Sequence, residues 1–178
     1  MENFIKVIDN FIPKSLENKL DNILSYHLHY QYVPNTVEKN DEDYCPSFSR
    51  KIYHQLELEN TDKDYLFTLS PLYVFLNSQN LFLHNILQAR IFFQIPSIAP
   101  PIHKPHVDLN VPHQVCLYYV NDSDGDTIIY DSTGKTIRKI SPKKGRMIFF
   151  NGNLKHSAST PTQNHRAVIN YNVITEKI

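Results

Sequence analysis

A succession of short apolar segments fills the second half of the chain, and this pattern limits the fold more than any other feature. Each segment is rich in Ile, Val, Phe and Tyr, and turn residues separate it from the next. The segments span residues 89–95, 106–109, 114–120, 127–130, 135–140, 146–150, 155–159 and 166–174. A parallel sheet would place a helical pattern between its strands, whereas short strands at regular spacing predict a sandwich or a barrel.

The first half of the chain carries a different, helical pattern. Four apolar residues repeat at helical spacing after Pro13, and they predict a helix over residues 15–26. Ser70 is expected to cap a second helix, with Pro71 as its first residue, extending to about residue 80. A short strand is expected before Pro13. The sequence therefore predicts a mainly β protein with flanking helices, of the α+β class.

We expect one domain over residues 1–178, since neither a repeat nor a linker divides the chain. Residues 1–85 would form the helical support and lid, and residues 86–175 the β core. The polar segment 34–49 is interrupted by two prolines and is predicted to be a mobile loop that closes as a lid.

Composition excludes several classes of protein. The 178 residues contain 18 Lys and Arg against 18 Asp and Glu, and 41% of them are hydrophobic. A disordered chain would be less apolar and more charged. A general nucleic-acid binder would be basic, and the basic cluster at 135–146 has no interleaved aromatic residues, so we interpret it as a solvated hairpin.

Compartment is predicted from three further observations. The N-terminus has no basic stretch followed by an apolar core, so no secretory signal is expected. The apolar stretch at 81–95 is broken by polar residues and is too short to span a bilayer. Only two cysteines are present, Cys45 and Cys116, which suits a reducing cytoplasm.

The chemistry is expected at His106-Val107-Asp108. If this segment is a strand, His106 and Asp108 point to the same side. His156, after another apolar strand, is the best third ligand. Two His and one carboxylate form the facial triad of non-haem Fe(II) oxygenases, which leaves open positions on the metal. Arg166 follows ten residues after His156 and could pair with a carboxylate of an acidic co-ligand.

These residues, in this order, resemble the iron(II)/2-oxoglutarate-dependent oxygenases. The similarity covers about residues 86–175 and includes the Cys-Leu-Tyr-Tyr-Val-Asn segment at 116–121. Within that group the chain is most similar to the prolyl-4-hydroxylase-like branch, including its small phage members. The resemblance implies a double-stranded β-helix, a cupin-like jelly roll with the metal between its sheets.

The same resemblance implies the cofactors and the site. Fe(II) would be held by His106, Asp108 and His156, with O2 and 2-oxoglutarate as co-substrates. The C5 carboxylate of 2-oxoglutarate would pair with Arg166 and with Tyr119, which matches a Tyr of the prolyl hydroxylases.

Two positions depart from the family pattern. Val168 replaces a Ser or Thr found two residues after the Arg in several members, and the strand before the metal lacks a Tyr. Gln94 is the nearest polar replacement for that Tyr.

The family resemblance implies hydroxylation of a C–H bond with release of succinate and CO2. A protein or peptide side chain is the first expected substrate, a free amino acid or small metabolite the alternative, and no membrane partner is expected. Nucleic acid is disfavoured because Asn172 stands where dealkylating relatives carry a second Arg. A catalytically silent jelly-roll binding module is the alternative from another class. His103 and His113 are expected in surface loops, and His165 is expected to face away from the site.

Overall fold

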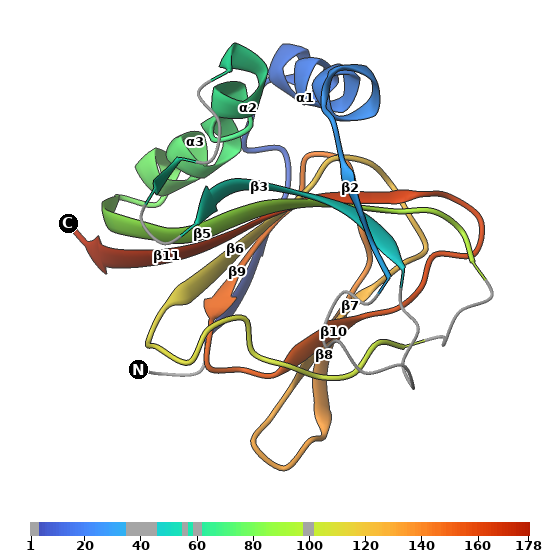
Figure 1. Ribbon diagram of the computed structural model, residues 1–178. Coiled ribbons are helices and arrows are strands. Elements are labelled where there is room, and N and C mark those ends of the chain that lie inside the picture. Colours follow the sequence, from blue (N-terminus) through green and yellow to red (C-terminus); the bar gives the residue numbers. More distant parts are fainter. Residues whose placement is uncertain (1–3, 35–45, 55–56, 59–61, 98–101) are drawn as a thin grey trace.

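Two antiparallel sheets and a layer of helices build the molecule (Figure 1). The computed structural model describes residues 4–34, 46–54, 57–58, 62–97 and 102–178. In chain order the elements are β1 (Ile5–Ile8), α1 (Lys14–Asn22), a π-helical turn (Ile23–His27), β2 (Gln31–Val33), β3 (Ser47–His54), β4 (Glu57–Leu58), α2 (Lys63–Phe67), α3 (Ser70–Ser78), β5 (Leu81–Gln94), β6 (Gln114–Tyr119), β7 (Thr127–Tyr130), β8 (Thr136–Ile140), β9 (Met147–Asn151), β10 (His156–Ala158) and β11 (Arg166–Lys177).

The larger sheet has the strand order β1-β9-β6-β11-β5-β3-β2, with β4 added beside β3. The long strand β11 lies between β6 and β5 and is antiparallel to both. The smaller sheet has the order β10-β7-β8. This pair of antiparallel sheets is the predicted jelly-roll architecture, and the mainly β fold with flanking helices is confirmed.

Strand alternation divides the core into two layers. On β6, Cys116 and Tyr118 face the helices, where they join a large apolar cluster that includes Leu72 and Phe75 of α3. The intervening residues of β6 face the smaller sheet. Figure 1 shows the helices packed on one face of the larger sheet, which leaves the opposite face for the second sheet and the site.

The strand pattern of the second half is largely confirmed, with one exception. Residues 106–109 are not a strand, and only His106 makes an isolated β-bridge, to His156. Pro105 and Pro112 flank the segment, and proline cannot donate a ladder hydrogen bond. The prediction that His106 and Asp108 lie on one side of a strand was therefore wrong.

The first half contains more strand than its sequence pattern indicated. The strands β2, β3 and β4 and the helix α2 were missed, and β5 begins at Leu81 rather than at residue 89. The first predicted helix divides into α1 and the π-helical turn. Ser70 is not the cap of α3: it lies inside the helix and donates a hydrogen bond to the carbonyl oxygen of Phe67.

The predicted lid and the predicted absence of a membrane span concern different parts of the chain. The proposed lid falls mostly on residues 35–45, which lie outside the described residues, and its last three residues open β3. Within the described ranges, no helix combines the length and apolarity that crossing a bilayer requires.

Candidate metal centre and pocket

Two backbone hydrogen bonds join the segments that carry the histidines. His106 N–H donates to the His156 carbonyl at 3.0 Å, and His156 N–H donates to the His106 carbonyl at 2.9 Å. His156 begins β10 of the smaller sheet, so this bridge fastens the loop before β6 to the edge of that sheet. The two imidazoles lie side by side, with ring centroids 4.8 Å apart.

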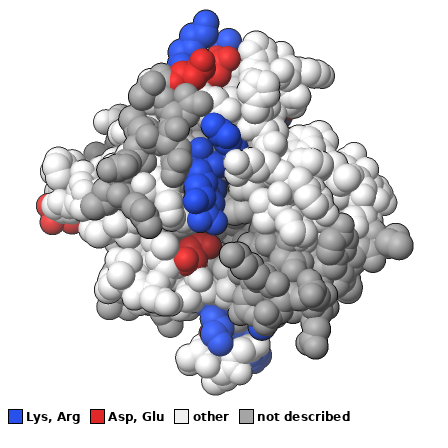
Figure 2. Space-filling model, viewed as in Figure 1, with Lys and Arg blue, Asp and Glu red and all other residues white. Residues whose placement is uncertain are grey.

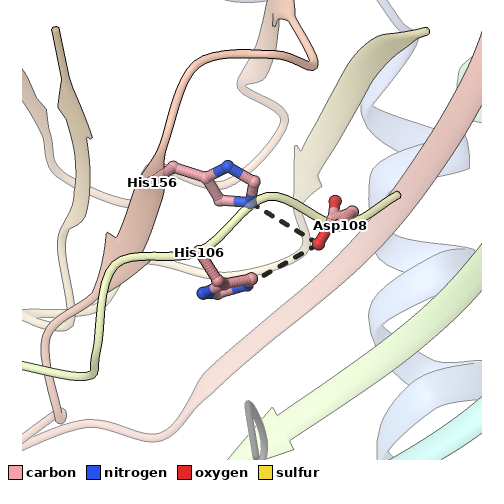
Figure 3. Close-up of side chains that lie close together, drawn as sticks. All are labelled: His106, Asp108 and His156. Atoms are coloured by element: carbon pink, nitrogen blue, oxygen red, sulfur yellow. Dashed lines mark ion pairs between the residues drawn. The ribbon is translucent and has the colours of Figure 1, made fainter. Parts of the chain in front are cut away.

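Both imidazoles converge on one carboxylate oxygen (Figure 3). Oδ1 of Asp108 lies 3.6 Å from Nε2 of His106 and 3.6 Å from Nε2 of His156. The three ligand atoms lie within 4.8 Å of one another. Nδ1 of His106 bonds to the carbonyl oxygen of Lys104, and Nδ1 of His156 to that of Leu154. A carbonyl partner places the proton on Nδ1, which leaves the Nε2 lone pair free to bind a metal.

Asn170 supplies the orientation that a strand at residues 106–109 would have given. It lies on β11, and its Nδ2 donates to Oδ2 of Asp108 at 2.9 Å. That bond occupies one carboxylate oxygen and turns the other, Oδ1, toward the histidines. The sequence analysis missed Asn170, although its place four residues after Arg166 puts both on the same face of β11.

Electrostatics favour the anionic form of this carboxyl. Burial raises the pKa of Asp108, but the charge of His156 and hydrogen bonds from the two histidines and Asn170 outweigh it and hold the pKa well below the ordinary value. Burial lowers the pKa of His156, yet the Asp108 charge raises it overall. The carboxylate is thus ready to bind a cation, which the converging Nε2 atoms would ligate with it.

The donor set fits a divalent iron ion. Two imidazole nitrogens and one carboxylate oxygen meet on one side of a pocket, so the remaining positions of a bound metal would open into it. Structural zinc sites prefer four ligands and usually cysteine, and the one described cysteine, Cys116, lies buried in the helix-side cluster.

Arg166 lies at the other end of the same pocket and is 5% exposed. Its guanidinium donates to three neutral acceptors: Nε to the Gly125 carbonyl at 2.8 Å, Nη2 to Thr127 Oγ1 at 3.0 Å and Nη1 to Gln94 Oε1 at 3.2 Å. Three of its five N–H groups are therefore used. Among the described residues it makes no ion pair, so a buried positive charge keeps donors for an incoming anion.

Gly125 permits this placement. A Cβ at that position would lie 2.9 Å from Cδ of Arg166 and 3.0 Å from the Ser159 carbonyl oxygen. Both contacts are closer than ordinary van der Waals distance, so a larger residue would displace the arginine side chain or the backbone beside it.

Tyr119 and Gln94, the two other predicted co-substrate residues, both lie beside Arg166. The Tyr119 hydroxyl donates to Thr127 Oγ1 at 2.7 Å, and its ring centroid is 5.8 Å from the guanidinium carbon of Arg166. Burial raises the pKa of Tyr119 to about 12, so its hydroxyl stays protonated. Tyr119 therefore contacts the arginine with its ring, while its hydroxyl reaches it through Thr127. Thr127 was not predicted, because a Thr that opens a strand carries no signal of its own.

The pocket between these ends has a volume of about 290 Å³. Paired residues of β11 and β5 form three successive rungs along its wall: Arg166 with Gln94, Val168 with Phe92, and Asn170 with Arg90. Gln88, which pairs with Asn172 in the next rung, also lines the pocket. The rung of Val168 and Phe92 is apolar. It separates the arginine end from the end that holds Asp108.

Two histidines that were expected at the surface are buried. His103 is 4% exposed and lines the pocket, and its Nε2 lies 3.3 Å from Thr160 Oγ1. Burial, helped by the charges of Arg166 and His106, lowers its pKa to about 4, so it is neutral at pH 7. His113 is 1% exposed and packs where Gly152 leaves space for its ring. The surface prediction failed because both loops fold inward against β10 and β9.

Known proteins resemble this chain in the region that carries the site. The family model of the 2OG-Fe(II) oxygenase superfamily matches residues 101–174, which include all three converging side chains and Arg166. No curated protein matches the chain in sequence.

Solved structures share the fold. An oxidoreductase of the 2OG-Fe(II) oxygenase family from Burkholderia pseudomallei superposes with a TM-score of 0.74 at 14% identity, over 95% of this chain and 84% of that one. A prolyl hydroxylase from Trichoplax adhaerens, in complex with a hypoxia inducible factor peptide, gives 0.69 at 16% identity, over 96% and 83%. A viral collagen prolyl hydroxylase from Paramecium Bursaria Chlorella virus-1 gives 0.62 at 15%, over 96% and 95%. At these identities the likeness shows the fold, the double-stranded β-helix.

Proposed function

Because the chain belongs to the 2OG-Fe(II) oxygenase superfamily and is a 2-oxoglutarate-dependent enzyme that uses Fe(II) and O2, we propose that it hydroxylates a C–H bond of a protein or peptide side chain. The reaction consumes one O2 and one 2-oxoglutarate and yields the hydroxylated product, succinate and CO2. One observation carries the proposal: a pocket with a His-Asp-His cluster at one end and a buried arginine without a described carboxylate partner at the other. This pairing suits a metal chelated by an acid whose far carboxylate is anchored separately.

In this proposal His106, Asp108 and His156 hold the iron. Bound iron supplies the activation of O2 that lets an unreactive C–H bond be hydroxylated. Asn170 keeps Asp108 turned so that one oxygen faces the metal, and the carbonyl partners of Nδ1 keep both imidazoles in the ligating tautomer.

Arg166 binds the C5 carboxylate of 2-oxoglutarate through its two unused N–H groups. Gln94 and Thr127 fix the guanidinium on either side, and Tyr119 fixes Thr127. Val168 and Phe92 line the middle of the pocket, where the carbon chain of the co-substrate would lie, and their apolar surfaces exclude water there.

A peptide substrate is supported by the fold shared with prolyl hydroxylases, one of which was solved with a peptide bound. A free amino acid or small metabolite is the second candidate, since a pocket of about 290 Å³ is of the size that holds small molecules. The domain scheme, with residues 1–85 as support and lid and 86–175 as core, and a cytoplasmic location remain parts of this proposal.

The test is turnover of 2-oxoglutarate by purified, iron-loaded protein. We expect succinate release that is lost in His106→Ala and in Asp108→Ala. Iron analysis and a 2-oxoglutarate titration accompany it, because a silent binding module would bind neither. Undiminished succinate release by the His106→Ala protein would contradict the assignment of the metal ligands.

A further inference from the structure

A second arginine, Arg90, lines the pocket on the metal side and has no role in the assignments above. It lies on β5, directly opposite Asn170 of β11, whose side chain holds Asp108. It is half-buried, and among the described residues it makes no ion pair. Burial lowers the pKa of Arg90, and the Asp108 charge opposes that effect, which places the guanidinium within electrostatic reach of the metal ligand.

Within the described part of the chain, the group that holds this guanidinium is neutral. With the carboxamide of Gln88 turned so that its oxygen faces Arg90, that oxygen accepts from Nη2 at 2.9 Å and from Nε at 3.2 Å. Gln88 belongs to the next rung outward. The remaining N–H groups of Arg90 are left for a ligand in the pocket, as they are at Arg166.

Lys51 adds a second positive charge at the same level of the sheet. It is exposed and lies directly opposite Arg90 on β3, so both side chains leave the sheet on the same face. Figure 2 shows a narrow strip of basic side chains at the centre of the molecule, over the region where Figure 1 draws β3 and β5. A metal at the nearby cluster would cancel the Asp108 charge and leave this end of the pocket positive.

The rungs show that this charge lies beyond the reach of the co-substrate. Arg90 and Gln94 are four residues apart on β5, about 13 Å along an extended strand. A five-carbon diacid is shorter than this spacing, so when its C5 carboxylate pairs with Arg166, its other end is assigned to the metal and not to Arg90. An anion at Arg90 therefore belongs to the other substrate.

We infer that Arg90, with Lys51 beside it, is an anion subsite that binds a carboxylate of the substrate. The inference rests on the proposed function and narrows it: the hydroxylated molecule carries a carboxylate close to the reacting carbon. A free amino acid, a peptide C-terminus and an acidic side chain next to the modified residue share this chemistry.

A probe of the subsite needs no knowledge of the substrate. The full-length protein is loaded with Mn(II) and saturated with 2-oxoglutarate, and proton relaxation of propionate and of neutral propionamide is measured. Mn(II) accepts the same ligand types as Fe(II) and broadens protons that approach it. We expect the enhancement of proton relaxation to be at least about tenfold larger for propionate than for propionamide. This factor is the scale of a charge-assisted hydrogen bond.

Substitutions test which residue causes the preference for propionate over propionamide. Arg90→Gln should abolish it, Arg90→Lys should keep part of it, and Lys51→Gln should weaken it. The matched controls are Arg138→Gln on exposed β8 and Lys6→Gln on β1 at the opposite edge of the larger sheet, which should leave it unchanged. Equal relaxation of the two probes, or a preference that survives Arg90→Gln, overturns the inference.

The affinity for 2-oxoglutarate distinguishes a failure of the Arg90 subsite from a failure of the proposed function. Wild type and Arg90→Gln should bind 2-oxoglutarate equally well, and a drop of tenfold in the variant would assign Arg90 to the co-substrate and overturn the subsite. Wild-type protein that binds no 2-oxoglutarate would contradict the proposed function itself.

Turnover then distinguishes the sources of the carboxylate. Free amino acids, peptides with a free C-terminus and peptides with internal Glu or Asp are each compared with their amide counterparts for stimulated succinate release. We expect one of the three sources to lose at least about tenfold in kcat/KM on amidation, and only while Arg90 is present. A substrate that is turned over equally well as its amide would overturn the inference.

Discussion

Arg166 and Arg146 occupy opposite electrostatic settings in one small protein. Arg146 lies at the edge of the larger sheet, where Nε and Nη2 donate to the two oxygens of Asp9 at 2.7 and 3.0 Å. Arg166 is buried and donates only to neutral oxygens. The carboxylate whose charge acts on Arg166, Asp126, is paired with Lys139 instead.

Under the proposed function, Arg146 is a structural arginine and Arg166 a binding one. Arg146 pairs with the Asp9 carboxylate of the same chain when the protein folds. Its ion pair can therefore stabilise the fold, but its charge is not left for a ligand. A buried guanidinium whose carboxylate must come from outside makes the folded state dependent on a ligand for full charge compensation. We therefore expect a substitution of Arg166 to weaken ligand binding, and loss of the Arg146 ion pair to lower stability without changing ligand binding.

The largest effect is expected for Arg166→Ala. Loss of a bidentate, charge-assisted pair should weaken 2-oxoglutarate binding by about 100-fold or more, measured by calorimetric titration of the Mn(II)-loaded protein. Arg146→Ala is the matched control and should bind 2-oxoglutarate as the wild type does. Equal weakening in both variants would mean that the loss is a general consequence of destabilisation.

Asn170→Ala should act on the metal rather than on the co-substrate. The Asp108 carboxylate loses the hydrogen bond that fixes its orientation, and changes of this kind cost about 10-fold in metal affinity. Competition for Mn(II) with a chelating dye measures the effect. Asn172→Ala, one rung further along β11, is the control because the hydrogen bond from β11 to Asp108 comes from Asn170. A variant whose metal affinity equals that of the wild type would leave Asn170 without this role.

His106, Asp108, His156 and Arg166 were expected at one site because spacing and residue type carry that information, and all four line one pocket. The sequence could not predict Asn170 or Thr127, since their roles depend on register: Asn170 reaches Asp108 across the pocket, and Thr127 meets Arg166 from the smaller sheet. The expected convergence of His106 and Asp108 rested on a strand that the structure does not contain. The two side chains converge because Asn170 orients Asp108 instead.

Tyr119→Phe tests whether the tyrosine meets the co-substrate directly. Through Thr127 it would affect binding only by loosening one acceptor of Arg166, so we expect the KM for 2-oxoglutarate to rise about fivefold, the scale of one hydrogen bond between neutral groups. Steady-state succinate release measures it. A rise close to that of Arg166→Ala would show that the hydroxyl binds the carboxylate itself.

The fold was predicted best where apolar runs are continuous. The strands β6, β7 and β9 are buried along their length, and their boundaries were predicted to within a residue or so. The strand β3 was missed because its sequence mixes polar and apolar residues, which an outer strand tolerates. Its position matters for function, since it carries Lys51 next to Arg90.

The smallest effect is expected at the surface pair. Hydrogen bonds from Arg146, together with Lys143, lower the pKa of Asp9 from 3.8 to about 2, against the opposing effect of partial burial. A lowered pKa in the folded state stabilises the protein above pH 3.8, and the contribution disappears as the pH falls through about 2. Because the pair is partly exposed, Asp9→Asn should lower the free energy of unfolding by about 1 kcal/mol at pH 7 and by less at pH 3, measured by urea unfolding. Affinity for 2-oxoglutarate should not change. A loss of co-substrate affinity in this variant would abolish the distinction between the two arginines, because it would couple the sheet edge to the pocket.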